Sequence, residues 1–161
     1  MRYVAIARHG DPLSRNYESG LSELGVEQAQ ALGVYLKNQI GEGSIRLITS
    51  PLGRAQETAR IVAGELGASS VETLDYLAGS QGINEGYTEG NVSYQRRLMS
   101  NIESRGRNAD AVVVISHEDV CEDFATFYLR AELAINGLLD RIGRGQAFLF
   151  DLVERTVRKI P

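Results

Sequence analysis

The chain has 161 residues, of which 43% are hydrophobic and 24% are charged, and its formal net charge is −4. This length suits one domain with a substantial buried core, and the composition is that of a folded globular protein, not a disordered or fibrous one. The negative charge gives no overall attraction to nucleic acid or to an anionic membrane, although arginines gathered in one cleft still suit a small anionic substrate. We therefore expect a single domain over residues 1–161, with no nucleic-acid or membrane partner.

Cysteine usage and the N-terminal sequence indicate the cellular compartment. Cys121 is the single cysteine, so the chain forms no internal disulfide, and its apolar neighbours predict a small core residue rather than a nucleophile. The N-terminus carries no basic and then apolar leader, and no apolar run approaches the roughly 18 residues of a membrane span. These features favour a cytoplasmic protein.

The first part of the chain alternates strand-like and helical patterns. Residues 2–7 form an apolar run typical of a buried strand, and the polar residues 11–20 predict a loop. A helix is expected from Ser22, a good N-cap, to about residue 38. A second strand is predicted at residues 45–49.

The next helix has the strongest pattern in the chain. Ser50 and Pro51 predict its start, as a capping hydroxyl followed by proline at the first helical position. Apolar residues then recur at three- and four-residue steps: Leu52, Ala55, Ala59, Val62 and Leu66.

The rest of the chain continues the alternation. Its predicted elements are a short strand near residues 71–74, a glycine-rich surface loop over residues 78–91, a helix around residues 94–102, a strand at residues 111–115, a helix around residues 120–127, and two strands within residues 146–160. Strands that alternate with helices favour a mainly parallel sheet of the α/β class.

The two histidines of the chain each end a hydrophobic strand-like run. His9 follows residues 3–7 and Arg8, and His117 follows residues 111–115 and a serine. In α/β folds the carboxyl ends of the strands form the edge where ligands bind. Since both histidines are placed this way, we predict an active site at that edge.

The tripeptide Arg8-His9-Gly10 combines three properties that suit attack on phosphorus. A neutral imidazole is a nucleophile when one ring nitrogen is held as a donor to a carbonyl or carboxylate. The adjacent guanidinium offers donors that match phosphate oxygens, and glycine leaves room for the backbone to approach a bulky oxyanion. We interpret His9 as a nucleophile for phosphoryl transfer.

The helix predicted at Ser50 adds a second anion site. Its N-terminus presents unpaired N–H groups, and Arg54 lies in the first turn. The alternative is a solvated surface arginine, but a cation is unfavourable there unless an anion binds. His117 would face this cluster as a phosphate donor or in proton transfer. A metal site is disfavoured by the histidine spacing and by the arginines, so no metal or cofactor is expected.

Four segments in this order resemble those of the histidine phosphatase superfamily, also called phosphoglycerate mutase-like. They are Arg8-His9-Gly10, residues 21–25 with Gln28-Ala29, residues 50–59, and residues 114–117. The Ser-Pro-x-x-Arg-Ala-x-x-Thr-Ala segment is the most specific of them. The compact length is similar to that of the short bacterial phosphohistidine phosphatases rather than the glycolytic mutases.

The resemblance implies a three-layer α/β/α sandwich with a mainly parallel central sheet, and a metal-free phosphoryl transfer through a phosphohistidine. On this chain it implies that His9 is the nucleophile and that Arg8, Arg54 and His117 form the phosphate pocket. Asn16 lies near the family's asparagine position and is a further phosphate-binding candidate.

The general acid is where the sequence departs from the family pattern. Many members have a glutamate in a Leu-x-Glu pattern after the third strand, but Tyr76 stands there in this chain. Asp75 is adjacent to that position, and Glu85 lies in the glycine-rich loop. Glu118 follows the second histidine, where the acid-phosphatase branch has an aspartate that serves as the acid. The alternative for Glu118 is a carboxylate that only stabilises a helix N-terminus.

The sequence therefore predicts a cytoplasmic phosphatase that passes phosphate from its substrate to His9 and then to water. The substrate is either a phosphohistidine-bearing protein or a phosphorylated small molecule. Two alternatives stay open: a phosphoglycerate mutase-like phosphotransferase, and a non-catalytic module that binds a phospho-ligand.

Overall fold

The computed structural model describes residues 1–68, 70–81 and 91–161, and its centre is a six-stranded sheet with the order β3-β2-β4-β1-β5-β6. The strands are β1 (Tyr3–Arg8), β2 (Ile45–Thr49), β3 (Val71–Thr73), β4 (Ala111–Ser116), β5 (Ala147–Asp151) and β6 (Thr156–Ile160). The first four strands pair in parallel, whereas β5 runs antiparallel to β1 and to β6. The sheet is thus mainly parallel, as predicted.

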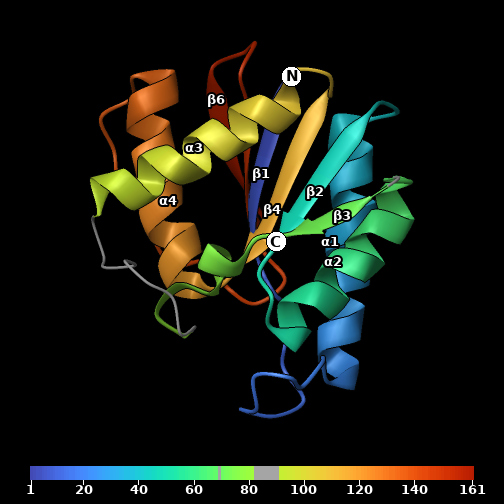
Figure 1. Ribbon diagram of the computed structural model, residues 1–161. Helices are drawn as coiled ribbons and strands as arrows, with labels where there is room; N and C mark the ends of the chain where they lie inside the picture. The colour runs from blue at the N-terminus through green and yellow to red at the C-terminus, as the bar shows by residue number, and fades with distance from the viewer. Residues whose placement is uncertain (69, 82–90) are drawn as a thin grey trace.

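Helices cover both faces of the sheet (Figure 1). Helices α1 (Glu23–Ile40) and α2 (Gly53–Leu66) pack together on one face, and α3 (Val92–Gly106) and α4 (Glu118–Leu133) lie on the other. A short 3-10 helix, η1 (Asp75–Gln81), follows β3. This arrangement confirms the three-layer α/β/α sandwich.

The central strands β1 and β4 are buried along almost their whole length. Val4 and Ile6 of β1 belong to the core that α3 and α4 cover, while Ala5 and Ala7 face α1 and α2. Strands that are covered on both faces need apolar side chains at every position, which explains why their sequences are continuous apolar runs instead of alternating ones. The edge strand β3, in contrast, is exposed at all of its residues.

The predicted start of α2 is wrong by two residues. The helix begins at Gly53 with Leu52 as its N-cap, and no side chain caps it. The Ser50 hydroxyl accepts a hydrogen bond from the backbone N–H of Leu52 at 3.3 Å and contacts His117. The Ser50 hydroxyl thus closes a two-residue turn after β2 and binds His117, and the helix begins only after this turn.

The surface loop predicted over residues 78–91 is also wrong for its first part. Residues 78–81 belong to η1, and Ala78 is buried. The Asp119 carboxylate at the start of α4 accepts hydrogen bonds from the Ser80 backbone N–H at 3.0 Å and from the Ser80 hydroxyl at 2.5 Å. This contact ties η1 to α4. Residues 82–90 lie outside the described residues.

Within the described ranges, no helix combines the length and the apolar character that a membrane crossing demands.

Candidate active site

The parallel pairing of β1 with β4 brings the two histidines together. Arg8 and Ser116 are register partners at the ends of the two strands, so the next residue of each chain segment is a histidine. The His9 N–H donates to the Ser116 carbonyl at 3.0 Å, and the rings of His9 and His117 lie edge to face with their centroids 5.0 Å apart. The prediction that both residues lie at one edge of the sheet is confirmed.

The imidazole of His9 is held in one orientation. Its Nδ1 lies 2.6 Å from the Gly10 carbonyl oxygen, which can only accept, so Nδ1 carries the hydrogen and Nε2 keeps its lone pair. Burial, together with the nearby charges of Arg54 and Arg8, lowers the pKa of His9 to about 4. The ring is therefore neutral at neutral pH, the form that a nucleophile requires.

Gly10 is needed for a reason that the sequence did not indicate. A β-carbon at this position would lie 2.5 Å from the carbonyl oxygen of Gly25 in α1. The missing side chain thus allows the strand-end loop to pack against α1. On the other side, the Gly10 N–H donates to the Thr58 hydroxyl at 3.1 Å, and that hydroxyl donates to the Arg54 carbonyl at 2.7 Å. The loop that carries His9 is therefore fixed between α1 and α2.

Arg8 is held by two groups and has one unsatisfied nitrogen. One terminal nitrogen donates to the Ile142 carbonyl at 2.9 Å, and the other pairs with the Glu118 carboxylate at 2.7 Å. Its Nε is buried and has no hydrogen-bond partner among the described residues. The guanidinium is thus held by α4 and by the segment before β5, and its Nε can still donate a hydrogen bond.

Arg54 is the second residue of α2 and is buried, so it is not a solvated surface arginine. It lies beside His9 in a hollow of about 310 Å³. The residues that line this hollow are Arg8, His9, Pro12, Ser14, Arg15, Tyr17, Arg54 and Arg144. Four guanidinium groups around one small hollow favour an anionic occupant.

Arg144 and Arg15 also line the hollow, and the sequence did not mark either of them as a site residue. Arg144 precedes β5 and forms an ion pair with Asp11, whose carboxylate also accepts from the Ser22 hydroxyl at 2.7 Å. Arg144 is far from the other site residues in sequence, and no local pattern marks it. Arg15 is next to Asn16, the residue of this loop that the family resemblance singled out.

Asn16 is not among the residues that line the hollow. Its side-chain oxygen accepts from the Glu18 backbone N–H at 3.1 Å, and the residue is exposed. This contact closes a local turn in the loop.

The general-acid candidates lie in different surroundings. The Glu118 carboxylate reaches the site through its ion pair with Arg8, and its side chain is 53% exposed. Asp75, at the start of η1, is exposed and does not line the hollow. Tyr76 is buried against Tyr94 and Arg97, and burial raises its pKa to about 12. Glu85 lies outside the described residues. Only Glu118 among the described candidates contacts a residue of the hollow.

His117 is fully buried at the N-terminus of α4. Its Nε2 lies 2.7 Å from the Ser50 hydroxyl, while Nδ1 has no partner among the described residues. Burial lowers the pKa of His117 to about 2, with further contributions from His9 and the two arginines. The ring is neutral and has one unsatisfied nitrogen close to His9.

Cys121 is a core residue, as predicted. It is fully buried in α4, its thiol donates to the Ala7 carbonyl at 3.1 Å, and burial raises the pKa of the thiol. A thiol that stays protonated in the core is not a nucleophile.

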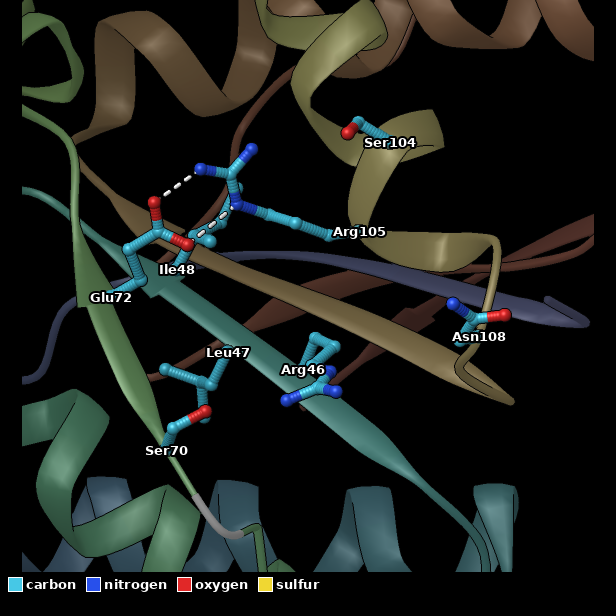
Figure 2. A pocket seen from close by; sticks show the side chains of 8 residues that line it. All are labelled: Arg46, Leu47, Ile48, Ser70, Glu72, Ser104, Arg105 and Asn108. Atoms are coloured by element: carbon cyan, nitrogen blue, oxygen red, sulfur yellow. Dashed lines mark hydrogen bonds and ion pairs between the residues drawn. The ribbon is translucent and has the colours of Figure 1, made fainter.

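A second hollow, of about 240 Å³, lies between β2, β3 and the end of α3 (Figure 2). Glu72 and Arg105 form an ion pair across it, with the Arg105 Nε 2.7 Å from a carboxylate oxygen. The Arg105 guanidinium also donates to the Asn101 side chain at 2.7 Å, so its charge is satisfied internally. None of the predicted site residues lines this hollow.

Solved structures of other proteins share the fold. The protein histidine phosphatase SixA, complexed with tungstate, has a TM-score of 0.71 at 22% identity, over 98% of this chain and 96% of that chain. A mycobacterial glucosyl-3-phosphoglycerate phosphatase with inorganic phosphate has a TM-score of 0.65 at 20% identity, over 99% of this chain and 94% of that one. At these identities the similarity concerns the fold alone.

A sequence relative and a family model add to this comparison. The chain is 35% identical over 78 residues to a protein of Yersinia pestis (strain Pestoides F) described as "Probable phosphoglycerate mutase GpmB". That match covers 44% of this chain and 35% of the relative, so the chain spans about a third of the relative's length. The family model of the histidine phosphatase superfamily (branch 1) matches residues 4–149, nearly the whole chain. The chain therefore belongs to the histidine phosphatase superfamily, branch 1.

Proposed function

We propose that the protein is a phosphatase that transfers a phosphoryl group from its substrate to Nε2 of His9 and then to water. One observation carries the proposal: the neutral His9 shares its site with two buried nitrogens, Arg8 Nε and His117 Nδ1, that have no partner among the described residues. Leaving a buried polar group unsatisfied costs about 1–3 kcal/mol. An anion that accepts from both nitrogens removes this cost.

The reaction has two in-line steps. In the first, the bond from phosphorus to the leaving group breaks as a bond to His9 Nε2 forms, and the hydrogen bond from Nδ1 to Gly10 holds the ring as it becomes positive. Arg8 and Arg54 neutralise the charge on the phosphoryl oxygens. In the second, water attacks phosphorus, the P–N bond breaks, and inorganic phosphate leaves with His9 again neutral. No metal or cofactor enters either step.

The substrates we propose carry a leaving group that departs easily. Tyr76 is buried away from the hollow, and Asp75 does not line it, so the family's usual acid position supplies no proton donor from these residues. A phosphohistidine-bearing protein fits this requirement, and an aryl-like phosphate ester of a small molecule is the second option. The fold shared with a protein histidine phosphatase supports the first. We propose a cytoplasmic single domain that works without a nucleic-acid or membrane partner.

The test is to incubate the protein with an aryl phosphate and with a phosphohistidine protein, and to measure free phosphate and acid-labile phosphoenzyme. We expect both products from the wild type and neither from His9→Ala, while Cys121→Ser, a change in the core, retains turnover. Wild-type rates in His9→Ala would reject the nucleophile. Phosphate moved to a second hydroxyl of the substrate, without release, would indicate a mutase. Binding of phosphate without labelling would indicate a non-catalytic module.

A further inference from the structure

Ser50 is a fully buried serine that contacts His117 directly. Among the described residues, its Oγ lies within hydrogen-bonding distance of two nitrogens: the Leu52 backbone nitrogen at 3.3 Å and His117 Nε2 at 2.7 Å. The short contact to Nε2 joins β2 to the strand end of β4. The direction of this hydrogen bond decides which ring nitrogen of His117 carries the hydrogen.

The direction follows from the hydrogen-bonding capacity of each partner. The Leu52 N–H is a donor, so it occupies a lone pair of Oγ and cannot receive the hydroxyl hydrogen. The hydroxyl is buried, and the other partner within reach is Nε2. The Ser50 O–H therefore donates to Nε2, which must then carry the lone pair. A neutral imidazole has one N–H, and that hydrogen is on Nδ1.

We propose that Ser50 is a positioning residue that holds His117 as its Nδ1–H tautomer, so that Nδ1 donates to the phosphoryl group on its way to and from His9. This role rests on the proposed function. The buried Nδ1 has no acceptor among the described residues, and the His117 ring lies 5.0 Å from that of His9. A phosphoryl oxygen is the acceptor that the site lacks. With the opposite tautomer, Nδ1 would present a lone pair to an anion and repel it.

The chain offers a matched control for Ser50. Ser116 is also a fully buried serine, and it directly precedes His117 in sequence. Its hydroxyl donates to the Leu77 carbonyl at 2.6 Å and does not contact the ring. Ser116→Ala thus removes the same atom from a similar environment without touching the tautomer of His117.

The experiment is two-bond proton–nitrogen NMR of protein with ¹⁵N-labelled histidine, which reads the tautomer independently of activity. The two histidines are assigned with His9→Gln. We expect the Nδ1–H pattern for both residues in the wild type. In Ser50→Ala the signal of His117 shifts toward the Nε2–H pattern, while His9 serves as an internal reference and does not change. Ser50→Thr keeps the hydroxyl and preserves the Nδ1–H pattern, and Ser116→Ala does the same.

The second readout is the affinity for inorganic phosphate or vanadate, measured by titration. We expect Ser50→Ala to weaken binding by about 10- to 100-fold, the effect of losing a hydrogen bond to a charged group. An Nε2–H pattern for His117 in the wild type would overturn the proposal, and so would an unchanged pattern or unchanged affinity in Ser50→Ala. If the tautomer and affinity results hold but no phosphate is released from any substrate, the role of Ser50 stands and the proposed function fails.

Discussion

Arg8 and Glu118 form an ion pair at 2.7 Å, and each is the sequence neighbour of one of the two histidines. The pairing of β1 with β4 that joins His9 and His117 also brings these two charged groups together. The carboxylate is thereby held beside the proposed phosphate site, and its side chain is 53% exposed to solvent. Glu118 is thus either the proton donor or a support for the guanidinium.

Substitution of Glu118 separates these two roles. If Glu118 is the acid, Glu118→Gln lowers kcat/KM for an alkyl phosphate by about 10²-fold or more, and lowers it much less for an aryl phosphate, because a general acid matters most for a poor leaving group. If the residue only supports Arg8, both substrates lose activity equally. Because the proposed preference for easy leaving groups rests on a missing proton donor, we expect the equal loss, and Asp75→Asn as the control changes neither rate. Equal kcat/KM values of the wild type on both substrates would reject the proposed preference for easy leaving groups.

Arg54 should account for much of the anion affinity. It is buried beside His9, whereas Arg158 on the edge strand β6 is exposed and far from the site in the sheet order. Phosphate at 100 times its dissociation constant stabilises the wild type by about 2.7 kcal/mol, which corresponds to a rise of several degrees in Tm. We expect Arg54→Ala to lose most of this rise in thermal scans with and without phosphate, and Arg158→Ala to keep it. The same rise in both variants would contradict a role for Arg54 in binding.

The buried His9 makes stability depend on pH in a defined window. Its pKa is about 4 in the folded protein against 6.5 for the ordinary group, so the unfolded chain binds the extra proton between these values. The free energy of unfolding therefore falls as pH is lowered from about 6.5 toward 4, by about 3 kcal/mol from this residue at most. Urea unfolding at pH 7 and pH 5 measures the change. His9→Gln should make the dependence shallower without removing it, because the buried His117, with a pKa of about 2, also gains a proton on unfolding over this pH range. An unaltered slope in that variant would show that His9 contributes nothing to it.

Because Gly10 packs closely against α1, adding a single methyl group at this position should strongly reduce the stability of the protein. Gly10→Ala places a β-carbon 2.5 Å from the Gly25 carbonyl oxygen, and because both partners are backbone, neither can move without shifting β1 or α1. We expect a loss of about 1–3 kcal/mol in the free energy of unfolding, with reduced phosphatase activity. Gly64→Ala is the control, since Gly64 lies inside α2 and a β-carbon there would meet nothing within 4 Å. That substitution should stabilise by about 0.5–1 kcal/mol. If both variants unfold at the same urea concentration, the packing explanation for Gly10 is wrong.

Local sequence patterns determined the elements of this protein and the placement of its histidines. The apolar runs before His9 and His117 had to be buried on both faces, which made them central parallel strands and placed both rings at the carboxyl edge of the sheet. The position of Arg54 in the first turn of α2 could also be predicted from the sequence, because it depends on residues only a few places away in the chain.

Tertiary structure alone decided which distant groups meet at the site. Arg144 lines the hollow because the segment before β5 packs against the end of β1. No sequence pattern near Arg144 predicts this contact. Ser50 carries a signature that is typical of a helix cap, yet its hydroxyl bonds to His117, since β2 and β4 are neighbours in the sheet. A buried hydroxyl can bond to more than one group, so Ser50 accepts from the nearby Leu52 N–H and also bonds to the distant His117 ring. The second contact forms because folding buries the imidazole, and a buried ring nitrogen without a hydrogen-bond partner costs about 1–3 kcal/mol.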